Sequence, residues 1–545
     1  MKSSCKVRDK INDIAIEKSY ITVGDKRNFV ITFLVAALCN IQYIANELPF
    51  ADFNVCSEYH FSGQWELSLG RWLLPYLDHM RWGITGSVLS SILAVVWLAI
   101  GGVLLNRIFA IHNRALSFML NALLGVSPFF YDTLASYHCS SEYMFGFLLA
   151  IAGVYCTMRF EGHIWSIIVG GILIACSLGI YQAYLGVSCG LYIFTLIKHT
   201  LENNKTVRLL LKELLNYVSA GVTGLVLYFL NLRINLKIWN VQMSDYAGAN
   251  TSIVSRLCNI PFRLIDALKA CFHYYFTDEI INNGAYGRGY WNAGILIVAI
   301  IAIIIIIIHW KDKMVPMGKI GNIGFMILCI GLIPIALGII EVVVSEKDIN
   351  QLMSAPYVLM YVFALYTIDV LAQKQYINRL LLVIMTLPFI GIIHSCFAMD
   401  NASSIAIKMN MNKQKTVAMS IMDTIISTDS CSIDDPILFI GTAQATNSTN
   451  SFLDNSSEIY HMASGESTRY GQIWESPSDI SNRAWYHFIR HQLGVSLNLV
   501  QDTDKYNDII HTTEFARMPT YPEKGYIDMI DGIWVVKLES NPDKE

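Results

Sequence analysis

The stretch WNAGILIVAIIAIIIIIIHW, residues 291–310, decides the fold class of this chain. Its centre, Ala293–Ile308, has no charged residue and contains ten isoleucines. Trp291 and Trp310 stand 19 residues apart, which is roughly 28 Å along an α-helix and close to the thickness of a hydrocarbon core. Tryptophan favours the two membrane interfaces. Isoleucine alone favours a strand, but a lone strand in lipid leaves its backbone groups unpaired, so the stretch predicts a transmembrane helix.

The rest of the chain has the same character. Of 545 residues, 54% are hydrophobic and 15% are charged, against about 25% charged in soluble domains. On either side of residues 291–310, ten more apolar blocks bring the number of predicted spans to eleven. The turn between the fifth and sixth spans is short, so a count of ten or twelve spans stays open. The spans lie near residues 29–45, 84–105, 115–131, 143–158, 164–180, 184–197, 214–230, 292–309, 321–343, 354–371 and 380–397. We therefore expect an α-helical polytopic membrane protein.

The basic residues predict its orientation. Of the 22 Lys and Arg residues in the N-terminal tail and the short connections, 19 lie in the tail and in alternate loops. Only Arg71, Arg81 and Lys347 lie in the intervening loops. Because Lys and Arg accumulate on the cytoplasmic side, the N-terminus is predicted inside the cell and, after an odd number of spans, the C-terminus outside. We found no basic stripe or nucleic-acid motif, so no nucleic-acid partner is expected.

This topology divides the chain into three parts. Residues 1–28 form a cytoplasmic tail, residues 29–397 a transmembrane domain with outer loops 46–83, 132–142 and 231–290, and residues 398–545 a small extracytoplasmic α+β domain. In that last part, residues 436–441 (PILFIG) and 532–538 (GIWVVKL) have the pattern of strands, and residues 483–493 that of a helix. The twelve cysteines show no metal-ligand spacing, and Cys56–Cys139 and Cys258–Cys271 are candidate disulfides.

The first outer loop carries the residues suited to chemistry. It holds the acids Asp52 and Glu58, then Trp65, Arg71 and Trp72. A carboxylate can take a proton from a sugar hydroxyl, and arginine presents a planar fork to phosphate oxygens. Tryptophan faces can stack on sugar rings. The loop therefore suits sugar-phosphate chemistry at a membrane surface, although a solvated loop with interfacial aromatics has the same composition.

Four short motifs resemble a known family. Gly70-Arg71-Trp72 stands at the re-entry into the membrane, with acids before it. Ser127-Pro128-Phe129 with Glu142-Tyr143, then residues 177–185 (SLGIYQAYL) and residues 351–353 (QLM), follow in order. Together these motifs resemble the Gtr-type glucosyltransferase family of bacteria and phages over roughly residues 30–400.

The resemblance implies a fold and an activity. The fold would be that of the GT-C membrane glycosyltransferases. The donor would be a sugar, typically glucose, on a polyprenyl phosphate, and the acceptor a surface polysaccharide such as O-antigen or a glycolipid. The enzyme would work in the bacterial inner (plasma) membrane, with a flippase and a donor synthase as partners. Some GT-C enzymes use a divalent cation, so Mg or Mn stays open as a cofactor, although no metal ligands are assigned.

One departure from the family concerns the catalytic base. The family's acidic position before the Gly-Arg pair falls on Asn54 here, with Asp52 and Glu58 on either side. Asp52 is the preferred base and Glu58 the second choice. In the expected single inverting displacement, this carboxylate deprotonates the acceptor hydroxyl while Arg71 stabilises the departing phosphate.

Three more residues are candidates for substrate contact. Glu142, at the start of the fourth span, is either a donor-site or metal-binding carboxylate or an ordinary interfacial acid. Tyr181 and Gln182 lie at an outer turn, where a capping or packing role fits as well as substrate binding.

Three other functions compete with this interpretation. A transporter or lipid flippase would need ionisable residues within the spans, which here are nearly free of charge. Another GT-C activity, such as a polymer ligase, would share the acidic outer loop and differ mainly in substrate. A non-catalytic surface protein would act through its C-terminal domain.

Overall fold

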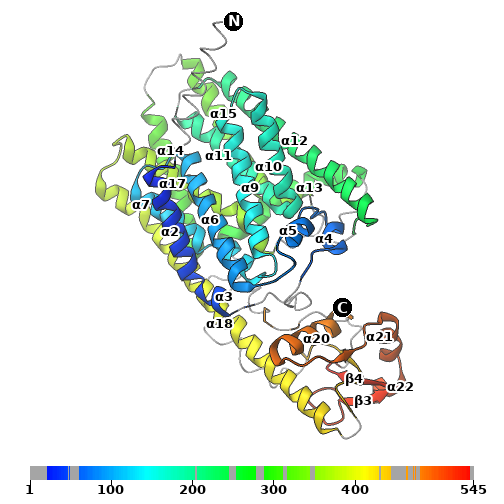
Figure 1. Ribbon diagram of the computed structural model, residues 1–545. Coiled ribbons are helices and arrows are strands. Elements are labelled where there is room, and N and C mark those ends of the chain that lie inside the picture. The colour runs from blue at the N-terminus through cyan, green and yellow to red at the C-terminus, as the bar shows by residue number, and fades with distance from the viewer. Residues whose placement is uncertain are drawn as a thin grey trace.

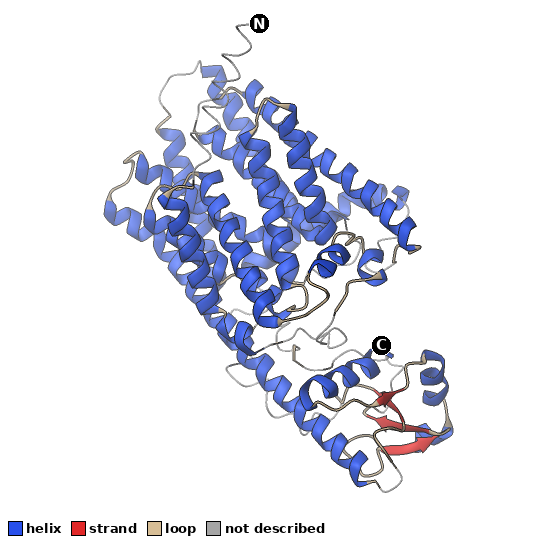
Figure 2. Cartoon of the chain, viewed as in Figure 1, coloured by secondary structure: helices blue, strands red, loops and turns tan. Residues whose placement is uncertain are grey.

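A helical bundle and a small β-sheet are joined by one long helix in the computed structural model (Figure 1). Figure 2 shows that the strands are confined to the C-terminal part. The structure describes residues 21–46, 48, 60–202, 205–244, 253–277, 288–310, 316–343, 350–428, 431–443, 459, 462–463, 470–471, 473 and 479–539.

Seven described helices are long and apolar enough to cross a membrane, by length and composition. They are α6 (Ser87–Phe109), α9 (Ser140–Arg159), α12 (Val207–Trp239), α14 (Arg288–Ile308), α15 (Pro316–Leu337), α17 (Val358–Gln373, with the turn before it) and α18 (Arg379–Ser427). Three further helices have 17 residues, roughly 26 Å: α2 (Val23–Cys39), α10 (Ile164–Ile180) and α11 (Leu185–Leu201). The fold is that of a helical membrane protein, and the count of eleven spans stays a prediction.

The predicted span at residues 115–131 is two helices. Helix α7 (Arg114–Gly125) ends before Ser127, and α8 (Pro128–Ala135) begins directly after it. Pro128 has no N–H to continue a helix and forces the residue before it into an extended conformation, which Ser127 adopts with φ −69° and ψ 141°. Helix α8 therefore occupies the beginning of the predicted outer loop 132–142.

The predicted outer loop 231–290 is also largely helical where it is described. Helix α12 runs through its first part to Trp239, and α13 (Ile253–Phe272) continues into a π-helical turn, η4 (His273–Thr277). Cys258 and Cys271 lie on the single helix α13, where thirteen residues correspond to roughly 20 Å. A disulfide needs Cα atoms within about 7 Å, so the prediction of this bridge was wrong, and Cys271 is a free thiol. Cys139 is free as well, and Cys56 lies outside the described residues.

Helix α18 crosses the boundary predicted after residue 397. It continues without a break to Ser427, and its 49 residues span roughly 74 Å. Beyond it, four strands form a sheet in the order β2-β1-β4-β3. Strand β1 (Pro436–Ile440) is parallel to β2 (Asn498–Leu499) and β4 (Ile533–Lys537), and β3 (Ile527–Ile530) is antiparallel to β4. Strands β1 and β4 and helix α20 (Asp479–Leu493) lie where the sequence predicted them; β2, β3, α21 (Thr503–Ile510) and α22 (Thr513–Arg517) were not predicted.

The predicted inner loops gather at one end of the bundle. The start of α2, the α6–α7, α9–α10 and α11–α12 connections and the end of α17 contact one another there. The contacts are Asp25–Arg107, Ile108–Lys198, Glu161–Lys205 and Asn113–Asp369. We call this the basic end. The opposite end, which we call the site end, holds α3 (Ile41–Asn46), α4 (Gln64–Ser68) and α5 (Leu74–Met80), and α18 leaves the bundle there (Figure 1).

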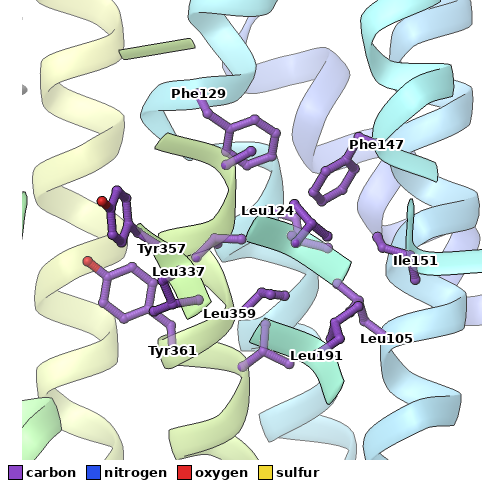
Figure 3. Close-up of a cluster of buried hydrophobic side chains, with 14 of the residues drawn as sticks. Leu105, Leu124, Phe129, Phe147, Ile151, Leu191, Leu337, Tyr357, Leu359 and Tyr361 are labelled. Atoms are coloured by element: carbon purple, nitrogen blue, oxygen red, sulfur yellow. The ribbon is translucent and has the colours of Figure 1, made fainter. Parts of the chain in front are cut away.

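The interior of the bundle is one apolar cluster shared by most helices. Figure 3 shows part of it, where Phe147 and Ile151 of α9, Leu191 of α11 and Leu359 of α17 converge. This packing fixes the helix ends that carry the candidate site.

Candidate functional site

The Gly70-Arg71-Trp72 motif forms a tight turn between α4 and α5 at the site end. Gly70 has φ +89°, a conformation that favours glycine. A Cβ on Gly70 would also lie 2.5 Å from the Tyr228 hydroxyl and 2.6 Å from the Gln182 amide nitrogen. Both the backbone conformation and the space around it therefore require glycine.

The turn is joined to the second motif, residues 177–185. The backbone N–H of Leu73 donates to the carbonyl of Gly179 over 2.8 Å. The Trp72 indole covers Gly179 so closely that a Cβ there would lie 2.5 Å from the ring. Trp72 is buried by this contact. Its ring therefore packs the two motifs together. The sequence had suggested that Trp72 stacks on a sugar ring, but the buried indole offers no face for this.

Gln182 and Tyr228 complete the junction. The Gln182 amide donates to the Leu69 carbonyl over 2.7 Å and to the Tyr228 hydroxyl over 3.1 Å. The Tyr228 hydroxyl in turn donates to the Gly70 carbonyl over 3.1 Å. Gln182 is thus a positioning residue, and Tyr228 of α12 is a partner that the sequence did not reveal.

Arg71 points from this turn toward a stacked pair of tyrosine rings. Its guanidinium carbon lies 5.1 Å from the ring centre of Tyr181 and 5.8 Å from that of Tyr143. Nη1 donates to the Tyr143 hydroxyl over 2.9 Å, and the two rings stack 5.0 Å apart. Burial opposes the charge of Arg71, but nearby Tyr143, Tyr181, Cys139 and Glu66 outweigh it and raise the Arg71 pKa above its usual value.

Arg71 lacks a counter-ion in the described part of the chain. Among the described residues no carboxylate lies within 4.0 Å of its guanidinium, and its buried Nε has no hydrogen-bond partner there. A cation that is partly removed from water and has no carboxylate beside it is costly unless an anion joins it. Arg71 is therefore poised for an anionic ligand.

Arg81, ten residues further along the chain, differs from Arg71 because it has carboxylate partners. It pairs with Asp78 at 2.7 Å and with Glu142 at 3.2 Å, and its Nη2 also donates to the carbonyl of His138. Asp78 is fully buried and accepts from the Ser62 backbone N–H over 2.8 Å. Nearby Glu142 and Asp78 raise the Arg81 pKa, although burial opposes its charge. This cluster closes the α4–α5 segment onto the start of α9.

Glu142 is therefore not an exposed interfacial acid. It is 6% exposed, and its Oε1 is held by Arg81. Its Oε2 is buried and has no hydrogen-bond partner among the described residues. The next residue along α9, Tyr143, holds Arg71, so Glu142 lies beside the anion site.

Burial also decides the state of His138. Burial, followed by the charges of His60, Arg81 and Arg71, lowers the His138 pKa well below its usual value. The ring lies 5.1 Å from that of His60, edge to face. His138 is therefore neutral near pH 7 and supplies packing and a carbonyl rather than a proton.

The two remaining motifs meet each other at the same end. The Gln351 amide, in the turn η6 (Gln351–Tyr357), donates to the Pro128 carbonyl of α8 over 3.0 Å. The η6 turn also contacts η2 (Gln182–Tyr184), directly after Tyr181. Four motifs spread over residues 70–353 of the sequence thus converge in space.

The two predicted bases, Asp52 and Glu58, lie outside the described residues. Trp65 is described and is 57% exposed on α4. Two further acids, Asp132 of α8 and Asp400 of α18, are fully buried, and no motif in the sequence singles them out. The described residues contain no group of three or more His, Cys, Asp or Glu residues that could hold a metal ion.

Comparison with known proteins identifies the family. The family model described as glucosyl transferase GtrII matches residues 57–368, more than half of the chain. The chain belongs to the GtrII glucosyltransferase family. It is therefore a glycosyltransferase with the helices of a membrane protein. No curated protein and no solved structure matches it.

The extent of the GtrII match bears on the site. It includes Arg71, Glu142, Tyr181, Gln182 and Gln351, and it ends before α18 begins. It also includes Glu58 but not Asp52. The sequence-based recognition of a Gtr-type glucosyltransferase is thereby confirmed.

Proposed function

We propose that this protein transfers a sugar, glucose by family membership, from a polyprenyl phosphate to a polysaccharide or glycolipid at the outer face of the cell membrane. The observation that carries the proposal is the partly buried guanidinium of Arg71, whose Nε is buried and which has no carboxylate within 4.0 Å among the described residues. Phosphate is an anion whose geometry matches this planar fork.

The proposed reaction is a single displacement with inversion. The acceptor hydroxyl oxygen attacks the anomeric carbon, a new C–O bond forms, and the bond from that carbon to the phosphate oxygen breaks. The hydroxyl proton passes to a carboxylate of the first outer loop, Asp52 or Glu58, and the electron pair leaves with polyprenyl phosphate. Arg71, fixed by Tyr143 and Tyr181, stabilises the negative charge that develops on the phosphate, an effect that depends on prior orientation.

The arrangement of the bundle supports a location of the site at the outer face of the membrane. Arg71 lies at the site end, and the Lys- and Arg-bearing connections lie at the basic end. Because basic connections stay in the cytoplasm, the site end is proposed to face outward. A polyprenyl-linked sugar and a surface polymer meet on that side, and a flippase and a donor synthase would supply the donor.

A divalent cation, Mg²⁺ or Mn²⁺, fits the same place as an additional ligand of the phosphate. Carboxylate oxygen is the ligand such ions prefer, and Glu142, the residue before Tyr143 on α9, has a buried Oε2 with no hydrogen-bond partner among the described residues. The role of Glu142 in this proposal is to hold that cation, while Arg81 holds Glu142.

The test compares two arginines in purified protein reconstituted into liposomes with polyprenyl-phosphate-glucose. Replacing Arg71 by Ala should lower kcat/KM about 10²–10³-fold, the cost of removing one preorganised donor to a developing negative charge. The control is Arg159→Ala. Arg159 is the last residue of α9, at the basic end, whereas Tyr143 near the start of the helix contacts Arg71, so this substitution should leave transfer unchanged. An Arg71→Ala enzyme with wild-type turnover would end the proposal.

A further inference from the structure

An apolar cavity of about 350 Å³ lies away from Arg71, between α13, α14, α15 and α17. Phe272 and Tyr275 line one side, Ala299 and Ile330 another, and Asn292 and Tyr361 the end. Almost all of the atoms facing the cavity are carbon. No part of the site described above uses this space.

The cavity opens sideways onto the face of the bundle that meets lipid. Three residues of its lining, Leu268, Phe272 and Ile330, are 44%, 55% and 38% exposed. Along α14 the lining runs from Asn292 to Ala299, roughly 10 Å of helix. Because α14 begins at Arg288 and is an apolar helix of spanning length, this stretch lies within the half of the membrane that adjoins the site end.

The polar groups at the end of the cavity bond to one another. The Tyr361 hydroxyl donates to the Asn292 side-chain oxygen over 3.0 Å, and the Asn292 amide donates to the Tyr275 carbonyl over 2.8 Å. Water in a cavity needs two to four polar partners, and these bonds leave few to offer. Hydrocarbon is therefore the occupant that suits the space.

A cation stands one helical turn beyond that end. Arg288 is 2% exposed, its guanidinium carbon lies 4.9 Å from the Tyr274 ring centre, and Nη2 donates to the Tyr274 carbonyl over 3.3 Å. The ligand that matches an apolar channel with a cation above it is a long-chain lipid with an anionic head group.

The packing connects this end of the cavity with the glycosyl site. Tyr274 stacks on Tyr357 at 4.5 Å, and Tyr357 ends η6, the turn that contacts η2 beside Tyr181. Figure 3 shows Tyr357, at the end of η6, and Tyr361 of α17 projecting on the same side. A chain of contacts through Tyr274, Tyr357 and η6 thus links the end of the cavity to the segment that carries Tyr181.

We infer that the cavity binds the isoprenoid chain of the sugar donor. The inference rests on the proposed function, because it takes the donor to be a polyprenyl phosphate. The chain enters sideways between α13 and α15, fills the space along α14, and leaves its charged head toward Arg288 and the site end. Methyl-branched, unsaturated isoprene units suit the aromatic wall of Phe272, Tyr275 and Tyr361.

The test fills the cavity from α14. Ala299 is buried in the lining, whereas its neighbour Ile300 is 48% exposed toward lipid. Ala299→Phe should raise KM for polyprenyl-phosphate-glucose about tenfold with little change in kcat, since the burial of about two methylene groups is worth a factor of ten in affinity. Ile300→Phe, the matched control, should leave both constants unchanged.

A photoreactive donor locates the chain directly. A donor with a diazirine on its isoprenoid chain should label peptides of α14, α15 and α17 in wild-type protein, and Ala299→Phe should lose most of that label. A phospholipid carrying the same group should not label the cavity when excess donor is present.

The outcomes separate the two proposals. If the wild type transfers glucose but the label falls elsewhere, or if a well-folded Ala299→Phe keeps its KM, the cavity assignment is wrong and the proposed function stands. Persistent phospholipid labelling that donor does not displace would also overturn it, because the cavity would then hold a structural lipid. If the wild type cannot use a polyprenyl-phosphate sugar at all, the proposed function fails and takes the inference with it.

Discussion

Gly70 has little tolerance for a side chain, and the chain contains a glycine that provides the matched control. Gly70→Ala would strain a positive φ and drive a methyl group to within 2.5 Å of Tyr228. We expect a loss of about 2–4 kcal/mol in unfolding free energy and loss of transfer activity. In Gly221→Ala the new methyl group on α12 would meet no atom within 4 Å, so stability should rise by up to about 1 kcal/mol. Thermal unfolding in detergent measures both; equal effects would contradict the structure.

Two substitutions can identify the catalytic base. Asp52→Asn and Glu58→Gln keep the size of each side chain and remove its ability to take a proton. One of the two should lower kcat about 10²–10⁴-fold, the usual contribution of a general base, while donor KM changes little. Steady-state transfer kinetics on each variant identify the base. If both variants turn over like the wild type, the displacement mechanism proposed above is wrong.

Single residues also show what the sequence could and could not reveal. Arg71, Tyr181 and Gln182 were predictable because they stand in short motifs with recognisable order. Arg81 and Tyr228 were not, since each is an ordinary residue of its own helix or turn. Only the packing of α9 and α12 against the α4–α5 turn brings them to the site.

Among the helices, the differences from prediction have local causes. The break in the span at residues 115–131 follows from Pro128, a signal that apolarity alone conceals. The sequence also indicates the length of α18. No proline or glycine, residues that usually mark a helix end, lies between Gly391 and Ser427. Hydropathy locates what lies in lipid, but it does not say where a helix continues into water.

The tie between α2 and α6 predicts a pH dependence. Asp25 pairs with Arg107 at 2.6 Å, and although burial raises its pKa, hydrogen bonds from Arg107 and Thr22 lower it from 3.8 to about 2. Because the folded pKa lies below the unfolded one, the pair stabilises the fold above pH 3.8 and is lost as pH falls toward about 2. The Arg107 side chain is 26% exposed, so the contribution is about 1 kcal/mol after solvent screening.

The measurement for this pair is a difference between two proteins. Thermal unfolding of the wild type and of Asp25→Asn, from pH 5 to pH 2, cancels the titration of every other carboxylate. The wild type should be more stable at pH 5, and the gap should close as the pH approaches about 2. A gap that is constant over this range would show that the ion pair contributes nothing.

The membrane orientation of the whole molecule can be tested at two loops. Gly162 lies in the α9–α10 connection at the basic end, and Gly494 follows α20 in the sheet region. Both are exposed and have open space around them, so both tolerate an inserted epitope tag. The tag at Gly494 should bind antibody on spheroplasts, and the tag at Gly162 should bind only after permeabilisation.

This pattern follows from physics that acts on the whole chain. Nineteen basic residues lie in the N-terminal tail and in alternate connections, against three in the intervening short connections, and the bundle gathers the basic loops at the basic end. Moving that end across the membrane would require many cations to cross against the positive-inside bias. The tagged proteins should keep transfer activity, which shows that each is inserted natively. If active protein instead exposes Gly162 to the exterior, Arg71 faces the cytosol and a donor carried on the outer leaflet cannot reach it.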